Sequence, residues 1–222
     1  MNRYIVVAPH PDDETLGCGG SLLRWKHEGA YISWLIVSGM KEELGYSQQQ
    51  MEERQRLIEE IAAAYEFDSV HNMDLPTTRL DTIPLADTTA HISQIFLEVE
   101  PTDVLLPFAN DIHSDHRYVF QAASSCTKWF RHNYIKRVLA YETLSETDFI
   151  MEPGNTGFAP NYFVRIDDHL DGKIVMAQRY AGEMRSFPFP RSVEAIRALA
   201  HRRGAQSGCR AAEGFVVLKY LT

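Results

Sequence analysis

Short apolar segments alternate with longer segments of helical period along most of this sequence, and that alternation limits the folds open to the chain. The apolar segments are rich in β-branched residues, as strands are, and the segments between them repeat their apolar residues at helical spacing. Strands that alternate with helices form βαβ units, which build a mostly parallel sheet with helices on both faces. We therefore predict an α/β fold, a Rossmann-like three-layer sandwich.

The pattern assigns most of the chain to particular elements. Strands are expected at residues 4–8, 31–37, 69–71, 103–107, 137–141, 162–166 and 215–220. Helices are expected at residues 13–28, 48–65, 86–99, 118–130, 171–184 and 192–202, with a turn-rich segment at 152–160. The sequence shows no internal repeat or linker, and 222 residues suffice for one large core, so we expect a single domain over residues 1–222.

Charge and composition exclude several classes of partner. A formal net charge of -8 and the lack of a Lys/Arg run argue against nucleic acid and acidic lipid surfaces. No apolar run approaches the roughly 20 residues of a membrane span, and the first strand is too short for a signal peptide. Three cysteines without a CxxC pair indicate reduced thiols. We expect a cytoplasmic protein that acts on a small molecule.

Two clusters of histidine and carboxylate residues follow the first and fourth predicted strands. The first reads HPDDE at residues 10–14, and the second reads HSDH at residues 113–116. In a doubly wound sheet the first and fourth strands are neighbours, and ligands bind outside their carboxyl ends. The two clusters, about a hundred residues apart, are therefore expected to face each other across one crevice.

Imidazoles and carboxylates together suit a borderline divalent cation, with zinc the most ordinary choice and iron, manganese or cobalt as alternatives. Three protein ligands leave one position for water, whose pKa the metal lowers. A neighbouring free carboxylate can accept the proton, and a free histidine can stabilise an oxyanion. The clusters therefore predict hydrolysis of an amide or an ester.

Each motif also has a purely structural interpretation. In HPDDE alone, Asp12 or Asp13 could cap a helix by accepting backbone N–H groups. The second cluster, at the end of a neighbouring strand, favours the site instead. Gly17, Gly19 and Gly20 lack the third glycine of a dinucleotide fingerprint and predict close packing of the helix on the sheet.

The HPDDE motif with its following TLGCGG segment, together with HSDHR at residues 113–117, resembles the PIG-L/LmbE-like family of zinc-dependent N-acetyl-sugar deacetylases. These enzymes remove acetyl groups from molecules that contain N-acetylglucosamine. Weaker matches lie at residues 56–63, 141–142, 158–164, 190–192, 203–204 and 212–215. The resemblance implies one Zn2+ per chain, held by His10, Asp13 and His116, with Asp12 as the general base.

The resemblance also implies roles around the metal. It assigns His113 to stabilise the tetrahedral intermediate as an imidazolium, and Asp115 to orient a histidine, with His113 as the expected partner. Arg56 matches a position that contacts substrate in relatives, and Arg191 is a weaker candidate for an anionic or sugar group. Some relatives carry a tyrosine where this chain has Asp111, which we expect to contact substrate hydroxyls instead.

We favour a zinc-dependent N-deacetylase that releases acetate and a free amine from an N-acetylglucosamine-type sugar or conjugate. The alternatives are a metal-dependent esterase or phosphoesterase and a non-catalytic sugar- or nucleotide-binding module. The far wall of the pocket is expected to come from loops at residues 73–84, 145–160 and 184–191. The resemblance further implies association into homo-oligomers.

Overall fold

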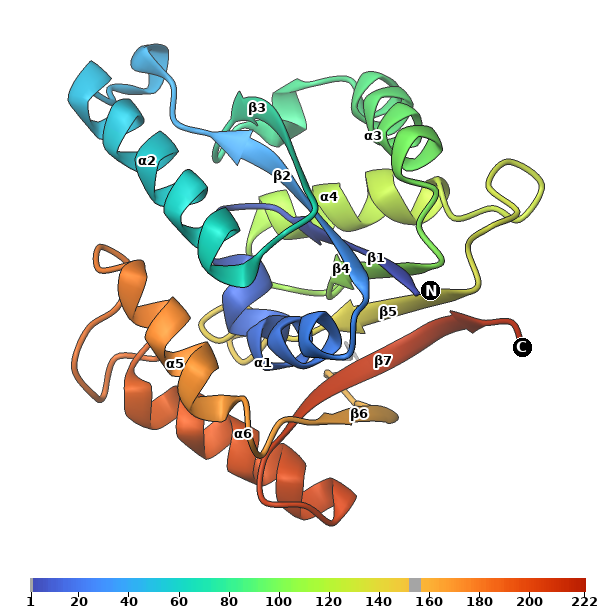
Figure 1. Ribbon diagram of the computed structural model, residues 1–222. Helices are drawn as coiled ribbons and strands as arrows, with labels where there is room; N and C mark the ends of the chain where they lie inside the picture. Colours follow the sequence, from blue (N-terminus) through green and yellow to red (C-terminus); the bar gives the residue numbers. More distant parts are fainter. Residues whose placement is uncertain (1, 152–156) are drawn as a thin grey trace.

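A seven-stranded, mostly parallel sheet forms the centre of the protein in the computed structural model, which describes residues 2–151 and 157–222 (Figure 1). The strands are β1 (Arg3–Ala8), β2 (Tyr31–Gly39), β3 (Ser69–Pro76), β4 (Asp103–Pro107), β5 (Arg137–Tyr141), β6 (Tyr162–Arg165) and β7 (Ala212–Tyr220). The helices are α1 (Asp13–His27), α2 (Gln48–Tyr65), α3 (Leu85–Val99), α4 (Ser114–Ser125), α5 (Leu170–Arg179) and α6 (Val193–Ser207), with short 3-10 turns η1 (Glu42–Leu44) and η2 (Leu80–Thr82).

The strand order is β3-β2-β1-β4-β5-β7-β6. β1 pairs in parallel with both β2 and β4, and β3 and β5 extend the parallel part outward. β7 runs antiparallel to β5 and to the edge strand β6. This confirms the predicted α/β class and the adjacency of the first and fourth strands.

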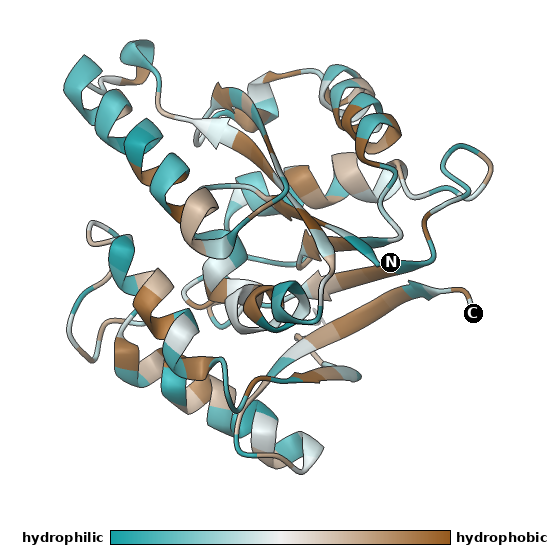
Figure 2. Ribbon diagram, in the orientation of Figure 1, coloured by the Kyte–Doolittle hydropathy of each residue, from teal (hydrophilic) through white to brown (hydrophobic). Residues whose placement is uncertain are grey.

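Side chains alternate across the sheet and build an apolar core on each face. Val6 and Ala8 of β1 pack on the side covered by α1, α2, α5 and α6, whereas Ile5 and Val7 pack beneath α3 and α4 (Figure 1). Because β1 is covered on both faces, it reads as a continuous apolar run. Figure 2 shows hydrophobic strands inside and hydrophilic outer helix faces, most clearly on α2.

α1 begins at the first motif and is broken after one turn, because Cys18 has non-helical dihedrals (φ -141°, ψ 18°). The Glu213 carboxylate accepts hydrogen bonds from the backbone N–H of Gly20 (3.0 Å) and Ser21 (2.7 Å), at the start of the second segment. A negative charge there stabilises the exposed N–H groups of a helix.

The glycines that follow the first motif serve packing, as predicted. A Cβ on Gly17 would collide with the Tyr141 ring, and one on Gly20 would lie 2.7 Å from Ile166. α1 therefore approaches the sheet and its neighbours more closely than a helix with larger residues could. This close approach helps to fix the first motif at the end of β1.

The structure differs from the predicted elements mainly at their ends. α4 begins at Ser114, four residues earlier than predicted, because the His113 ring accepts the Asp115 N–H as a cap (3.1 Å). β3 continues to Pro76, although the sequence predicts residues 69–71. α5 ends at Arg179 instead of residue 184, and part of the turn-rich prediction, residues 152–156, lies outside the described residues.

Among the helices in the described part of the chain, none combines the length and apolar composition that membrane crossing requires.

Candidate active site

The two polar motifs meet at the carboxyl ends of β1 and β4. β1 ends at Ala8 and is followed by His10, and its parallel neighbour β4 ends at Pro107, shortly before the second motif. The His10 Nε2 atom lies 3.0 Å from Asp115 Oδ2, although the residues are 105 positions apart. The parallel pairing of β1 with β4 therefore builds the predicted crevice.

A sharp turn sends the two consecutive aspartates in different directions. Asp12 has φ 140° and ψ -26°, a region that costs a non-glycine residue about 1–3 kcal/mol and is found at functional sites. Asp13 Oδ2 accepts the His10 N–H (2.8 Å) and lies 3.3 Å from His116 Nε2. Asp12 Oδ2 instead accepts a hydrogen bond from Arg191 (2.7 Å). One carboxylate thus joins the histidines while its neighbour stays apart.

His10, Asp13 and His116 fit a divalent cation. Each offers a ligand atom within 4.8 Å of the others. Asp13 Oδ1 and His116 Nε2 are buried and have no hydrogen-bond partner among residues 2–151 and 157–222. Leaving such atoms unpaired is costly, and a cation would satisfy both. Two histidines and one carboxylate are ligands that zinc, iron, manganese and cobalt all accept.

Asp111 lies behind the candidate metal ligands and not at the cleft, where the sequence predicts a contact with substrate. Its Oδ2 pairs with His116 Nδ1 (2.8 Å), and its Oδ1 accepts a hydrogen bond from Thr147 (2.6 Å). The side chain is fully buried with both oxygens engaged, so it cannot reach a substrate hydroxyl. A carboxylate on Nδ1 keeps a proton there and leaves Nε2, on the side of Asp13, as the atom that would bind a cation.

Asp115 contacts a different histidine from the expected one. Its Oδ2 pairs with His10 Nε2 (3.0 Å) and accepts the Thr78 N–H (2.7 Å), whereas only its backbone N–H contacts the His113 ring. Because His113 Nδ1 accepts that N–H, the ring proton of the neutral form sits on Nε2. Burial and the nearby His10 and His116 lower the pKa of His113. The geometry favours a neutral His113, where the sequence-based expectation is an imidazolium.

The ionisable groups of the candidate metal site shift one another's pKa values. Burial lowers the pKa of His10, but its hydrogen bonds to Asp115 and Asp13 raise it to about 9. Burial also lowers the pKa of His116, and Asp13 and Asp111 raise it to about 10. Burial raises the pKa of Asp13, yet the two histidines bring it well below its usual range. The carboxylate is therefore held ionised between two cationic rings.

Asp12 shows the opposite behaviour. Burial and the adjacent Asp13 charge raise the pKa of Asp12 to about 8, and Arg191 only partly offsets them. Two neighbouring carboxyl groups thus have pKa values pushed apart, which is the usual condition for giving them different roles. Asp12 is the one whose proton is exchangeable near neutral pH.

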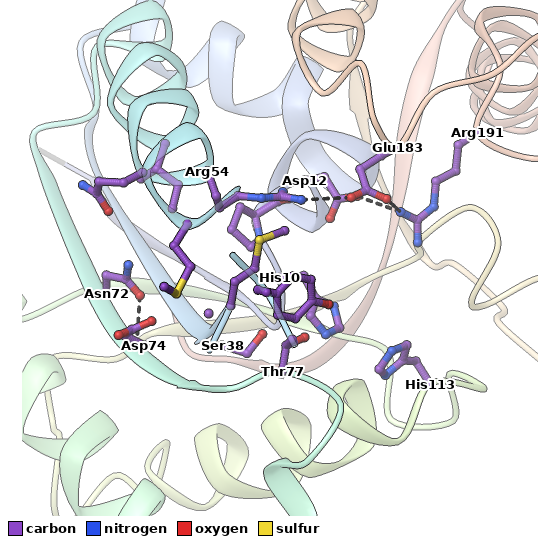
Figure 3. Close-up of a pocket in the computed structure, with 17 residues that line it drawn as sticks. His10, Asp12, Ser38, Arg54, Asn72, Asp74, Thr77, His113, Glu183 and Arg191 are labelled. Carbon is purple, nitrogen blue, oxygen red and sulfur yellow. Dashed lines mark hydrogen bonds and ion pairs between the residues drawn. The ribbon is translucent and has the colours of Figure 1, made fainter. Parts of the chain in front are cut away.

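A cleft of about 450 Å³ adjoins these groups, and His10, Asp12 and His113 are among the residues that line it (Figure 3). Arg54, Glu183 and Arg191 form a row along one side, joined by ion pairs. An apolar wall of Met40, Tyr46, Met51 and Ile58 comes from the end of β2 through α2. The volume suits a small-molecule ligand.

The arginine that α2 presents to the cleft is Arg54, not the predicted Arg56. Arg56 is exposed and does not line the cleft in the part of the chain that the structure describes. Arg54 shares a helix face with Met51 and Ile58, at spacings of three and four residues. Its guanidinium donates to Glu183 (3.0 Å). The helical period contained the signal that distinguishes the two arginines.

Arg191, for which the sequence predicts a contact with an anionic or sugar group, lines the cleft, and its guanidinium contacts protein groups. It donates to Asp12 (2.7 Å), Glu146 (3.1 Å) and the Ser145 hydroxyl (2.8 Å), and lies 3.4 Å from Glu183. Sequence reasoning missed both glutamates, because they come from loops without a motif. Arg191 therefore contacts the proposed base rather than presenting a free charge.

Comparisons with known proteins identify relatives of this chain. A family model described as PIG-L, GlcNAc-PI de-N-acetylase, matches residues 5–127. A curated Escherichia coli (strain K12) relative, "Uncharacterized deacetylase YaiS", is 28% identical over 156 residues, which cover 64% of this chain and 74% of the relative.

Solved structures share the whole fold. The conserved protein TT1542 from Thermus thermophilus superposes with a TM-score of 0.78 at 27% identity, over 100% of this chain and 97% of that one. N,N'-diacetylchitobiose deacetylase from Pyrococcus horikoshii superposes with a TM-score of 0.75 at 19% identity, over 98% of this chain and 84% of that one. GalB, the 4-carboxy-2-hydroxymuconate hydratase from Pseudomonas putida KT2440, superposes with a TM-score of 0.78 at 18% identity, over 100% of this chain and 98% of that one. Since these last two have different activities, the fold alone does not select a reaction.

Proposed function

Because this chain belongs to the PIG-L family, we propose that it is a metal-dependent N-deacetylase that acts as a single domain over residues 1–222. The reaction is hydrolysis of the N-acetyl amide of an N-acetylglucosamine-type sugar or conjugate, with release of acetate and a free amine. One observation carries the proposal. His10, Asp13 and His116 converge with two unpaired buried ligand atoms, and a separate carboxylate, Asp12, lies beside them.

We assign the metal to His10, Asp13 and His116, with Zn2+ as the first choice and Fe2+, Mn2+ or Co2+ as alternatives. When bound, the cation supplies Lewis acidity: it polarises the acetyl carbonyl and lowers the pKa of water. Asp111 and Asp115 orient the two histidines through their outer nitrogens, as carboxylates beside metal-binding histidines do.

Asp12 moves the protons. Arg191 occupies Asp12 Oδ2, which leaves Oδ1 to accept a proton from the attacking water and to return it to the leaving amine nitrogen. Without a metal, the pKa of Asp12 is raised to about 8. A divalent cation held by Asp13 would lower it, which favours the carboxylate form that a base requires. Arg191 positions this base and does not itself meet the reacting atoms.

His113 stabilises the oxyanion. Its Nδ1 is engaged by the Asp115 N–H, so Nε2–H is the donor available at the cleft. A fixed donor aimed at the developing negative charge stabilises the tetrahedral intermediate relative to the planar amide.

A two-metal phosphoesterase is less well supported. A second group of potential ligands, His10, His113 and Asp115, shares His10 with the first. Two cations would therefore compete for one imidazole. The family assignment favours amide hydrolysis, and the diacetylchitobiose deacetylase with the same fold acts on an N-acetylated sugar.

The test measures acetate and free amine released from N,N'-diacetylchitobiose by metal-loaded, chelated and reloaded protein. We expect release to stop on chelation and to return with metal. Asp12→Ala should abolish turnover yet retain about one equivalent of metal, whereas Asp13→Ala should lose the metal. Asp87→Ala, at an exposed position on α3, is the matched control. Undiminished release from metal-free protein would contradict the proposal, and metal loss from Asp12→Ala would mean that the two aspartates exchange roles.

A further inference from the structure

Part of the cleft lining is apolar. Met51 and Ile58 lie on one face of α2, and Met40 and Tyr46 come from the segment that connects β2 to α2. All four line the cleft that contains His10 and Asp12. Methionine side chains adapt their shape to irregular apolar groups, so this apolar wall suits a non-polar substituent rather than a further sugar hydroxyl.

The cleft offers no free cation for an anionic substituent among its described lining residues, apart from the histidines of the centre. Both arginines are neutralised: Arg54 pairs with Glu183, and Arg191 pairs with Asp12 and Glu183 (Figure 3). Asp74 adds a carboxylate on the opposite side and pairs with a lysine outside the cleft lining. A phosphate would have to displace a carboxylate from its arginine or lie close to carboxylates without a cation of its own, and both cost free energy.

From these two observations we propose that the amino-sugar substrate carries an uncharged, apolar substituent that packs on the apolar wall, and that sugars bearing a phosphate are poor substrates. The inference rests on the proposed deacetylase function, because it places the N-acetyl group at His10, Asp12 and His113. It adds which conjugates the enzyme accepts.

Three probes separate the possibilities: free N-acetylglucosamine, its phenyl glycoside in both anomeric forms, and N-acetylglucosamine 1-phosphate. We expect kcat/KM for the better phenyl glycoside to exceed the other two by at least about tenfold, as for an added apolar group that fills a matching pocket. Equal values, or a preference for the phosphate, would overturn the inference while leaving the deacetylase function in place.

Two variants test the two halves of the argument. Met51→Gln keeps the length of the side chain and should lower the phenyl-to-free ratio several-fold, whereas Met151→Gln, at an exposed position, should not change it. Glu183→Gln releases Arg54 and should raise the relative kcat/KM for the phosphate several-fold, with the exposed Glu53→Gln as its control. If Met51→Gln leaves the phenyl-to-free ratio of kcat/KM unchanged, the apolar subsite is refuted. If Glu183→Gln leaves the relative kcat/KM for the phosphate unchanged, the exclusion of phosphate by paired arginines is refuted.

Binding distinguishes this inference from the proposed function. Calorimetry of the three probes with metal-loaded Asp12→Asn protein measures preference without turnover. Preferential binding of the phenyl glycoside, combined with no acetate release by the unmodified enzyme, would support the apolar subsite and refute the deacetylase. Acetate release without preferential binding would do the reverse.

Discussion

His10 and His116 hold protons in the places where a metal would bind. Their pKa values of about 9 and about 10 mean that, without a metal, both rings are protonated at pH 7. The carboxylates that stabilise these protons are Asp13, Asp111 and Asp115. A cation requires neutral imidazole, so these protons must leave when it binds. The carboxylates that hold the rings in place thus make metal affinity depend on pH.

We therefore predict that Zn2+ affinity rises with pH from 6 to about 9. Each proton displaced contributes up to tenfold per pH unit, because raised histidine pKa values favour the metal-free state at low pH. Calorimetric titration in two buffers of different ionisation enthalpy measures both the affinity and the protons released. An affinity that stays constant between pH 6 and 8 would show that the rings are already neutral.

His113 should act in its neutral form. Its pKa is lowered from the ordinary histidine value of 6.5, so the ring is neutral at pH 7 and becomes protonated only at a pH below that value. We predict that His113→Ala lowers kcat by about 10²–10³-fold, the usual effect of losing one oxyanion donor. Activity of the unmodified enzyme should not decline between pH 7 and 8 because of this residue. A basic limb there that disappears in His113→Gln would instead indicate an imidazolium.

At the scale of elements, α1 is interrupted at Cys18, and a buried ion pair contacts its backbone on both sides of the interruption. Lys173 of α5 donates to the Leu16 carbonyl (2.8 Å) and to Glu213 of β7 (2.6 Å), while Glu213 also accepts N–H groups of α1. Both charged side chains are about 4–5% exposed. The pair therefore links α1, α5 and β7 just behind the first motif.

We predict that Glu213→Gln lowers the free energy of unfolding by about 3–5 kcal/mol, because it leaves the Lys173 ammonium buried without its counter-charge. Lys173→Met combined with Glu213→Gln should recover part of that loss. Urea unfolding of these two variants measures the effect, with Arg197→Gln, which breaks an exposed ion pair with Asp171, as a control expected to lose less than about 1 kcal/mol. A loss below about 1 kcal/mol for Glu213→Gln would mean that the pair contributes no more than a surface one.

The sequence predicted the elements well where one physical rule dominated. β4 and β5 are fully apolar at their centres and α2 carries a regular helical face beginning at a serine cap, and all three were predicted at their observed bounds. α4 was placed late because its cap is the His113 ring, an uncommon choice. β3 was shortened because, as an edge strand, it alternates with exposed polar residues after His71.

The same distinction holds for the site. Strand pairing brings the two motifs together, so His10, Asp13 and His116 could be identified from their places after β1 and β4. The partners of Asp111 and Asp115 depend on side-chain directions that spacing does not encode. Glu146 and Glu183 come from loops, and only the folded chain shows that they hold Arg191.

In the molecule as a whole, strands from the first and the last parts of the described chain, β1 and β7, belong to one sheet. β7, close to the end of the described chain, pairs with β5 and packs on α1, and one apolar core includes residues from Tyr4 to Phe215. The site itself draws on both halves, since Arg191 contacts Asp12. Separate unfolding of an N-terminal and a C-terminal part would expose this shared core.

We therefore predict a single cooperative unfolding transition for the chain, in keeping with one domain. Trp25 and Trp34 are buried in the N-terminal half of the shared core, so their fluorescence reports on α1 and β2, whereas far-UV circular dichroism reports on all helices. The two signals should give the same urea midpoint and slope, because shared apolar surface couples the elements. Metal should move both midpoints upward together, since it binds only the folded ligand set. If the fluorescence transition preceded or followed the dichroism transition, the halves would unfold separately and residues 1–222 would contain more than one cooperative unit.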